Sequence, residues 1–275
     1  MDQSEVAFAK INLALHVRRR RDDGYHEIET LFSFAQDGDI LHASLSETLS
    51  LAIEGPFGHL LEADDNNLVM QTALRLKSRF GVKQGAKLRL DKRLPVASGI
   101  GGGSADAAAT ARLLCRLWGL NATEQELSDI LALLGADIPA CIFSRPSFGT
   151  GTGTLLELLD DSPITARHLL LVNPLQSVST AAIFKAWDGV DGGPLASGNI
   201  WEAALNGRND LEPLAAAICP AITEILDRLS QASPALVRMS GSGATCFALF
   251  DDAAALEVSR ATLDPQWWSM ASMLR

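Results

Sequence analysis

The residues of this chain that are best suited to chemistry form a glycine-rich stretch over positions 95–106. Four glycines fall within positions 99–103, and Ser104 follows them directly. Because glycine has no Cβ, a ligand can approach such a backbone closely. A strand pattern precedes the stretch and a helix pattern follows it, so the helix N-terminus would offer N–H donors and a positive dipole end to an anion. We therefore predict a phosphate cradle made of Pro95, Val96, Ala97, Ser98, Gly99, Ile100, Gly101, Gly102, Gly103, Ser104 and Ala105.

The spacing of this stretch differs from two common phosphate-binding motifs. A Walker A loop places a lysine after its last glycine, whereas here Ser104 stands at that position. The GxGxxG spacing of dinucleotide-binding folds is absent from the stretch as well. A glycine-rich turn between a strand and a helix can also be purely structural, and the Ser104 hydroxyl can be a plain helix cap. The length of the glycine run favours the phosphate interpretation.

A lysine and an asparagine occupy one face of the first predicted strand. Apolar residues alternate through positions 6–17, which predicts a strand with one apolar face. Lys10 and Asn12 share the other face, about 7 Å apart along the strand. A lysine on an edge strand often extends its amine to solvent, which is the structural alternative for Lys10.

Asp137 is the candidate acid–base residue. It follows Gly135 and Ala136 and precedes Ile138 and Pro139, where a helix is predicted to begin. The local sequence favours a carboxylate that caps this helix or complements its dipole. If a phosphoryl group lies in the cradle, the same carboxylate could accept the proton of an acceptor hydroxyl. Both roles stay open at this point.

The composition excludes several classes of function. Asp and Glu number 33 against 23 Lys and Arg, a formal net charge of −10, so the basic surface needed for nonspecific binding to nucleic acid or to an anionic membrane is absent. The four cysteines lack CxxC spacing, which predicts buried thiols of a reducing compartment. The N-terminal residues do not match a signal peptide, and no apolar run reaches the ~18 residues of a membrane span. We expect a cytoplasmic protein.

The elements that must position these residues mix strands and helices without a regular βαβα alternation. Helices are expected to end at Gly81 and Gly119, and Thr123 with Glu126 predicts a capping box. The pattern predicts an α+β fold in two parts. Strands are expected over residues 6–17, 25–34, 40–53, 87–94 and 168–173, and a strand–turn–strand over 236–250.

Taken in chain order, the motifs resemble those of the GHMP small-molecule kinases. They are AKINL from Ala9, DGYHEI from Asp23, PxxxGxGGGSAxAA from Pro95, GADIP from Gly135 and SGSG from Ser240. The motifs extend over nearly the whole chain. The glycine loop alone indicates only the superfamily, and the GYH segment is similar to members that act on a methylerythritol linked to cytidine diphosphate.

The resemblance implies a two-domain GHMP kinase fold. Its N-terminal domain, like ribosomal protein S5 domain 2, would cover residues 1–155, and a ferredoxin-like C-terminal domain would cover 156–275, with the active site between them. Residues 95–105 would hold the phosphates of ATP, with Mg²⁺ as the second cofactor and no protein metal ligand assigned. Asp137 would be the general base, with Lys10 favouring its ionised form and orienting the substrate hydroxyl.

The resemblance also implies a substrate and a set of residues that bind it. ATP would phosphorylate the 2-hydroxyl of the cytidine-diphosphate-linked methylerythritol, a step of isoprenoid precursor synthesis that does not use mevalonate. Tyr25 and His26 would recognise the cytidine, Phe184 would stack on the cytosine, and Asn12 would position the polyol. The only expected partner is this small molecule, without nucleic acid or membrane, and the chain is expected to be a monomer or a homodimer.

Three alternatives stay open beside this hypothesis. They are another GHMP kinase acting on mevalonate, homoserine or a sugar, a nucleotide-binding sensor without turnover, and an RNA-binding module. The sequence also departs from the family pattern at four positions. Ala97 and Ser98 stand where many members have glycine, Ala105 stands where a second serine is common, and Ala181 stands where a proline is common.

Overall fold

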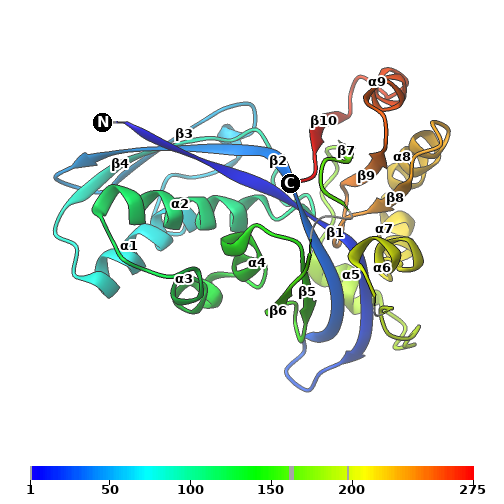
Figure 1. The fold of residues 1–275 in the computed structure, drawn as a ribbon, viewed down its shortest axis with the longest axis horizontal. Coiled ribbons are helices and arrows are strands. Elements are labelled where there is room, and N and C mark those ends of the chain that lie inside the picture. The colour runs from blue at the N-terminus through cyan, green and yellow to red at the C-terminus, as the bar shows by residue number, and fades with distance from the viewer. Residues whose placement is uncertain (1, 161–163, 197) are drawn as a thin grey trace. The chain divides into compact units, whose positions relative to one another are not determined.

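The computed structural model describes residues 2–160, 164–196 and 198–275 and has the predicted α+β composition (Figure 1). The chain forms two compact units, and each is assembled from separate stretches of sequence. Met1 and residues 161–163, which fall inside the two predicted domains, lie outside the described residues. The division of the chain at residue 155 stays a prediction. The first unit comprises Met1–Ala9, Asp37–Val96 and Gly101–Ser144, and the second comprises Lys10–Gln36, Ala97–Ile100 and Arg145–Arg275.

The first unit combines three neighbouring strands with a layer of helices. β2 (His26–Ser46) pairs with β4 (Gly85–Asp91) in antiparallel register, with Leu41 opposite Leu90, and β3 (Ser50–Glu54) lies parallel to β4. In Figure 1 the helices lie on one side of these strands. The helical segments are η1 (Gly58–Leu60), α1 (Leu68–Phe80), α2 (Gly102–Trp118), α3 (Glu124–Leu131), η2 (Ala132–Leu134) and α4 (Ile138–Phe143).

The helix boundaries of this unit follow local chemistry. The Asn67 side chain accepts the N–H of Val69 at the start of α1, and Gly81 ends that helix in the left-handed conformation. Gly119 ends α2 in the same way, and the predicted capping box of Thr123 and Glu126 is confirmed at α3.

The second unit contains two groups of strands. β1 (Gln3–Arg20) and β2 run into it from the first unit, and β2 pairs there with β5 (Ser147–Thr150), which pairs with β6 (Leu155–Leu158). The other group is an antiparallel sheet in the order β10–β7–β9–β8. Its strands are β7 (His168–Asn173), β8 (Leu236–Met239), β9 (Cys246–Phe250) and β10 (Trp268–Met273), and the helices of the unit are α5 (Thr180–Ala186), α6 (Ile200–Asn206), α7 (Glu212–Ile218), α8 (Ala221–Ser230) and α9 (Ala253–Ala261).

The main difference from the predicted elements lies in β2. The sequence predicts two strands, over 25–34 and 40–53, with residues 35–39 between them. The structure instead has one continuous strand, and a new strand, β3, begins at Ser50. Gly38 marks close contact between backbones and not a turn, because a Cβ at Gly38 would lie 1.8 Å from the carbonyl oxygen of Ala7.

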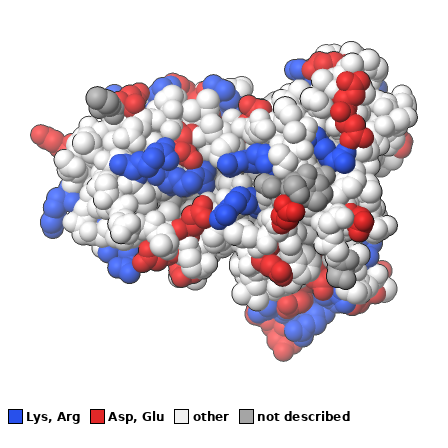
Figure 2. Space-filling model, viewed as in Figure 1, with Lys and Arg blue, Asp and Glu red and all other residues white. Residues whose placement is uncertain are grey.

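The structure also bears on the cysteines and on the membrane-spanning segments considered above. Within the described ranges no cysteine forms a disulfide, and all but Cys115 are buried. None of the described helices is long and apolar enough to cross a membrane. Figure 2 shows both basic and acidic side chains on the visible face, among larger areas of uncharged residues. Ion pairs such as Arg21–Asp23 and Arg18–Asp191 join charges of opposite sign.

Candidate active site

The glycine cradle leads directly into α2, in the first unit. Gly101 precedes the helix in the left-handed conformation, with a φ of 64°. Among the described residues no side chain caps the helix start, and the first turn carries no acidic residue. Gly103 is exposed and Ser104 is half-buried. This arrangement fits an anion, because backbone N–H groups at a helix N-terminus bind phosphate when no carboxylate competes for them.

The middle of the same loop, residues 97–100, belongs to the second unit. The backbone N–H of Lys10 donates to the carbonyl of Ile100 at 3.0 Å, so β1 holds the loop directly. The Ser240 hydroxyl donates to the carbonyl of Gly99 at 2.9 Å. A Cβ at Gly99 would lie 2.5 Å from the carbonyl oxygen of Ser240, which explains the glycine. The SGSG turn therefore supports the loop.

Lys10 and Asn12 lie together in a buried polar network, and both side chains are 3% exposed. The Lys10 amine donates to the amide oxygen of Asn12 at 2.8 Å, which confirms that they share a strand face. The Asn12 amide donates in turn to the Thr30 hydroxyl at 2.7 Å, and Thr30 donates to the carbonyl of Ala14. The Lys10 amine also lies 5.5 Å from the centre of the Phe32 ring. The sequence analysis missed Thr30, whose only signal is its place on the adjacent strand.

Asp137 lies at the start of α4 in the first unit and is half-buried. Its side chain makes no capping hydrogen bond to the described N–H groups of α4, so the capping role is not observed. α4 packs against α2, and a Cβ at Gly135 would lie 3.7 Å from the Ser104 hydroxyl. The segment that carries Asp137 therefore contacts the wall of the glycine cradle. Lys10 belongs to the other unit, so its pairing with Asp137 stays a prediction.

His26 and Phe184 lie side by side in the second unit, as a shared role would require. The two ring centres are 5.1 Å apart with an interplanar angle of 35°. A third ring, that of Trp187, packs edge-on against His26, with the two ring centres 5.7 Å apart. This contact was not predicted from the sequence. Trp187 follows Phe184 by three residues and stands directly after the end of α5, and this short spacing is the signal present in the sequence.

The electrostatic surroundings of His26 favour its neutral form. The ring is buried, and the guanidinium of Arg20 donates to Nε2 at 3.4 Å. Burial and the positive charge of Arg20 both lower the pKa of His26. Tyr25, its neighbour in sequence, is 65% exposed in the turn before β2, and its backbone N–H donates to Asp23. The structure thus groups His26 with Phe184 and leaves Tyr25 at the surface.

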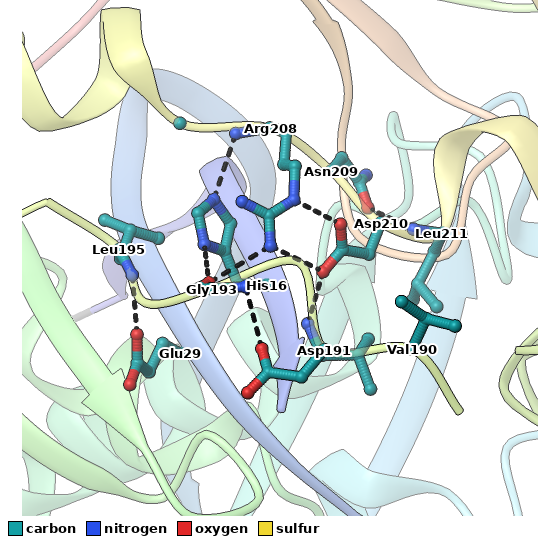
Figure 3. A network of polar contacts seen from close by, with 12 residues as sticks. His16, Glu29, Val190, Asp191, Gly193, Leu195, Arg208, Asn209, Asp210 and Leu211 are labelled. Carbon is teal, nitrogen blue, oxygen red and sulfur yellow. Dashed lines mark hydrogen bonds and ion pairs between the residues drawn. The ribbon is translucent and has the colours of Figure 1, made fainter. Parts of the chain in front are cut away.

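The loop that follows Trp187 is tied to β1 by the buried His16, as Figure 3 shows. The Arg208 backbone N–H donates to Nε2 of His16 at 3.2 Å, so Nδ1 carries the proton and donates to the carbonyl of Gly193 at 3.1 Å. The Leu195 N–H donates to Glu29 on β2 at 2.7 Å. Burial and Arg208 lower the pKa of His16, which keeps this connection neutral.

The described part of the chain holds no group of three or more His, Cys, Asp or Glu side chains that could bind a metal ion.

Comparison with known families and solved folds agrees with this geometry. The family model described as "GHMP kinases N terminal domain" matches residues 67–145, and "GHMP kinases C terminal" matches residues 201–262. A solved homoserine kinase from Cytophaga hutchinsonii ATCC 33406 has a TM-score of 0.72 over 99% of this chain and 95% of its own, at 16% identity, which shows a shared fold. The fold is that of a GHMP kinase, a class that uses ATP to phosphorylate small molecules.

Relatives of higher sequence identity show which GHMP kinases the chain is most similar to among those compared. A 4-diphosphocytidyl-2-C-methyl-D-erythritol kinase of Sphingopyxis alaskensis is 50% identical and covers 98% of both chains. One of Rhizorhabdus wittichii is 49% identical over 100% of this chain and 96% of its own. The crystal structure of a 4-(cytidine 5'-diphospho)-2C-methyl-D-erythritol kinase has a TM-score of 0.85 at 29% identity, over 100% of this chain and 99% of its own. The chain belongs to the family of 4-diphosphocytidyl-2-C-methyl-D-erythritol kinases.

Proposed function

We propose that this chain transfers the γ-phosphoryl group of ATP to the 2-hydroxyl of 4-diphosphocytidyl-2-C-methyl-D-erythritol. The observation that carries the proposal lies in the first unit, where a Cβ on Gly135 would be 3.7 Å from the Ser104 hydroxyl. This close approach brings the segment of Asp137 to the side chain that follows the glycines of the cradle. The names of relatives that are 49–50% identical support the same substrate.

On the nucleotide side, residues 95–105 would hold the phosphates through backbone N–H groups at the start of α2. The uncapped helix start and its lack of acidic residues among the described positions fit this role. Mg²⁺ bound with the nucleotide would neutralise charge on the transferring phosphoryl group.

On the acceptor side, Asp137 would take the proton of the 2-hydroxyl as that oxygen bonds to phosphorus. Lys10 would stabilise the ionised carboxylate and orient the hydroxyl, because a fixed positive charge strengthens both interactions. Asn12 would position the polyol while its own orientation is held by Thr30.

The cytidine would be bound in the second unit by His26, Phe184 and Tyr25. A neutral His26 can offer one hydrogen-bond donor to the base, and the half-buried ring of Phe184 offers a stacking surface. Tyr25 is exposed and would add its ring only once the ligand is bound. The partner is then a small molecule that carries cytidine diphosphate, and the chain would act as a monomer or a homodimer.

The test is the release of ADP from ATP and Mg²⁺ in the presence of different acceptors. We expect release with 4-diphosphocytidyl-2-C-methyl-D-erythritol and none above background with mevalonate, homoserine or free methylerythritol 4-phosphate. Equal release with mevalonate or homoserine would assign the chain to another GHMP activity. Binding of ATP without release for any acceptor would favour the sensor alternative.

A further inference from the structure

A buried cluster of three charged side chains lies beneath the glycine loop, in the first unit. The amine of Lys92 lies 2.6 Å from Asp39 on β2 and 2.6 Å from Asp106 on α2. All three side chains are at most 3% exposed. None of them belongs to the set of residues assigned to ATP, acceptor or cytidine above.

The cluster joins the two ends of the glycine loop. The second carboxylate oxygen of Asp39 accepts the backbone N–H groups of Arg93 and Leu94, at 2.5 and 2.8 Å, immediately before the loop begins at Pro95. Asp106 lies in α2, immediately after the loop ends. Lys92, through Asp39 and Asp106, therefore connects residues 93–94 before the loop to helix α2 after it.

The same lysine lies against the first residue of α2. A Cβ at Gly102 would lie 3.1 Å from the Lys92 amine and 3.9 Å from Asp39. Leu68, the first residue of α1, lies close to the second residue of α2, because a Cβ at Gly103 would be 3.3 Å from the Leu68 side chain. The side chain of Lys92 thus supports the helix turn whose N–H groups would face the phosphates.

The net charge of the cluster depends on a single proton. One ammonium and two carboxylates sum to −1, and a single added proton makes the cluster neutral. Within the described structure, Oδ1 of Asp106 is buried without a hydrogen-bond partner, so it is the oxygen that can take this proton. Burial raises the pKa of Asp106 to about 7; the charge of Lys92 opposes the shift and that of Asp39 adds to it.

Other charged groups near the cluster are paired away from it. Arg93 and Asp91, which flank Lys92, form an ion pair with each other, and the Arg93 side chain is 52% exposed. The two groups that act most strongly on Asp106 are therefore Lys92 and Asp39, members of the cluster itself.

We propose that Lys92, Asp39 and Asp106 are positioning residues that set the path of the glycine loop, and that the cluster takes up a proton when nucleotide phosphates bind to the start of α2. The proposal rests on the proposed function only in assigning the nucleotide to residues 95–105. Bound phosphates bring negative charge to the helix start, which disfavours a net negative cluster beneath it. The added proton would reside on Oδ1 of Asp106.

The experiment is titration calorimetry of the full chain with MgATP, without an acceptor, in two buffers of different ionisation enthalpy at pH 7. The difference between the heats measures proton uptake. We expect the wild type to take up as much as about half a proton, since a group with a pKa near 7 is half protonated beforehand. Asp106→Asn keeps the shape and neutrality of the protonated form, so it should bind MgATP without this uptake. Contributions from the ligand itself are the same for both proteins and cancel.

The second variant tests the positioning role. Lys92→Met should weaken MgATP binding at least about tenfold, because the loop ends lose their connection. The KM of the acceptor should stay within about twofold of the wild type. Lys87→Met, at an exposed position of β4, which ends directly before Lys92, removes the same charge and should change neither value.

Proton uptake that is equal in wild type and Asp106→Asn would overturn the proposal, as would a folded Lys92→Met variant with wild-type affinity for MgATP. If Lys92→Met does not fold, the comparison with Asp106→Asn still stands. A wild type that binds no MgATP would instead refute the nucleotide site itself, which is a different failure.

Discussion

The molecule buries two lysines in contrasting surroundings. Lys10, in the second unit, donates to the neutral amide of Asn12 and lies close to the Phe32 ring, while the amide is held by Thr30. Lys92, in the first unit, is held by two carboxylates at 2.6 Å. Both are buried, with 3% and 2% exposure.

The difference separates two uses of a buried cation. Strong pairing with carboxylates fixes a lysine and makes its removal costly for folding, because the remaining buried charges lose their partner. The hydrogen bond from Lys10 to the Asn12 amide does not neutralise the charge of the lysine, which in the proposed function acts on Asp137 and the acceptor hydroxyl. We expect substitutions around Lys92 to affect stability and nucleotide affinity, and substitutions around Lys10 to affect turnover.

The largest effect on stability is expected at Asp39, one of the carboxylates that hold Lys92. Asp39→Ala removes one of the two carboxylates that hold Lys92 and leaves two buried backbone N–H groups without their acceptor, so the free energy of unfolding should fall by about 3–5 kcal/mol. Urea denaturation measures the change. Glu47→Ala, at an exposed position directly after the same strand, should stay within about 0.5 kcal/mol of the wild type. Equal losses for both variants would remove the contrast.

The second prediction concerns Lys10. Lys10→Met should lower kcat about 10²–10³-fold, the effect of removing one electrostatic group that stabilises a transition state. Its melting temperature should fall by less than that of Asp39→Ala. Steady-state kinetics and thermal denaturation of the same preparation give both numbers. A variant that loses stability like Asp39→Ala but keeps its kcat would mean that the two lysines have the same role.

The third prediction uses the two buried histidines of the second unit. The pKa values of His26 and His16 are both lowered by burial and by a neighbouring arginine, so the unfolded chain binds these protons more readily. The free energy of unfolding should therefore fall as the pH drops below about 6.5. His26→Gln and His16→Gln should each reduce this slope. For His26→Gln alone, the affinity for cytidine monophosphate should also lose its pH dependence; an unchanged profile would exclude His26 from the cytidine site.

The smallest effect is expected in the loop. Ala97 has a φ of 52°, a left-handed conformation that costs an alanine about 1–2 kcal/mol. Ala97→Gly should relieve this strain but loses part of the gain to the greater freedom of glycine in the unfolded chain, leaving about 0.5 kcal/mol of added stability. Ala105→Gly, inside α2, should destabilise by about 1 kcal/mol. Opposite signs in urea denaturation are the expected result, and equal signs would contradict the assignment of strain to Ala97.

Much of the fold and part of the candidate site follow from local patterns. Two-residue periodicity was enough to place Lys10 and Asn12 together, and Gly81 marked the end of α1. The predicted interruption between residues 34 and 40 is absent from the structure, where Gly38 permits close backbone contact within one continuous strand.

The Lys92 cluster could not be predicted in this way. Its residues are 53 and 14 positions apart along the chain, and each resembles an ordinary charged side chain in its own segment. Only the pairing of β2 with β4 and the return of the chain into α2 bring them together. His26, Phe184 and Trp187 are intermediate, since the spacing of the last two was visible and their contact with His26 was not.

The central claim is that this chain phosphorylates the 2-hydroxyl of 4-diphosphocytidyl-2-C-methyl-D-erythritol with Asp137 as the base. The most direct measurement is ³¹P NMR of the reaction with wild type and with Asp137→Asn, with MgATP affinity measured on both. We predict a new phosphomonoester on the 2-oxygen with the wild type. With Asp137→Asn, we predict a rate about 10²–10⁴-fold lower at nearly unchanged MgATP affinity. A phosphate on another oxygen, or full turnover by Asp137→Asn, would contradict the account.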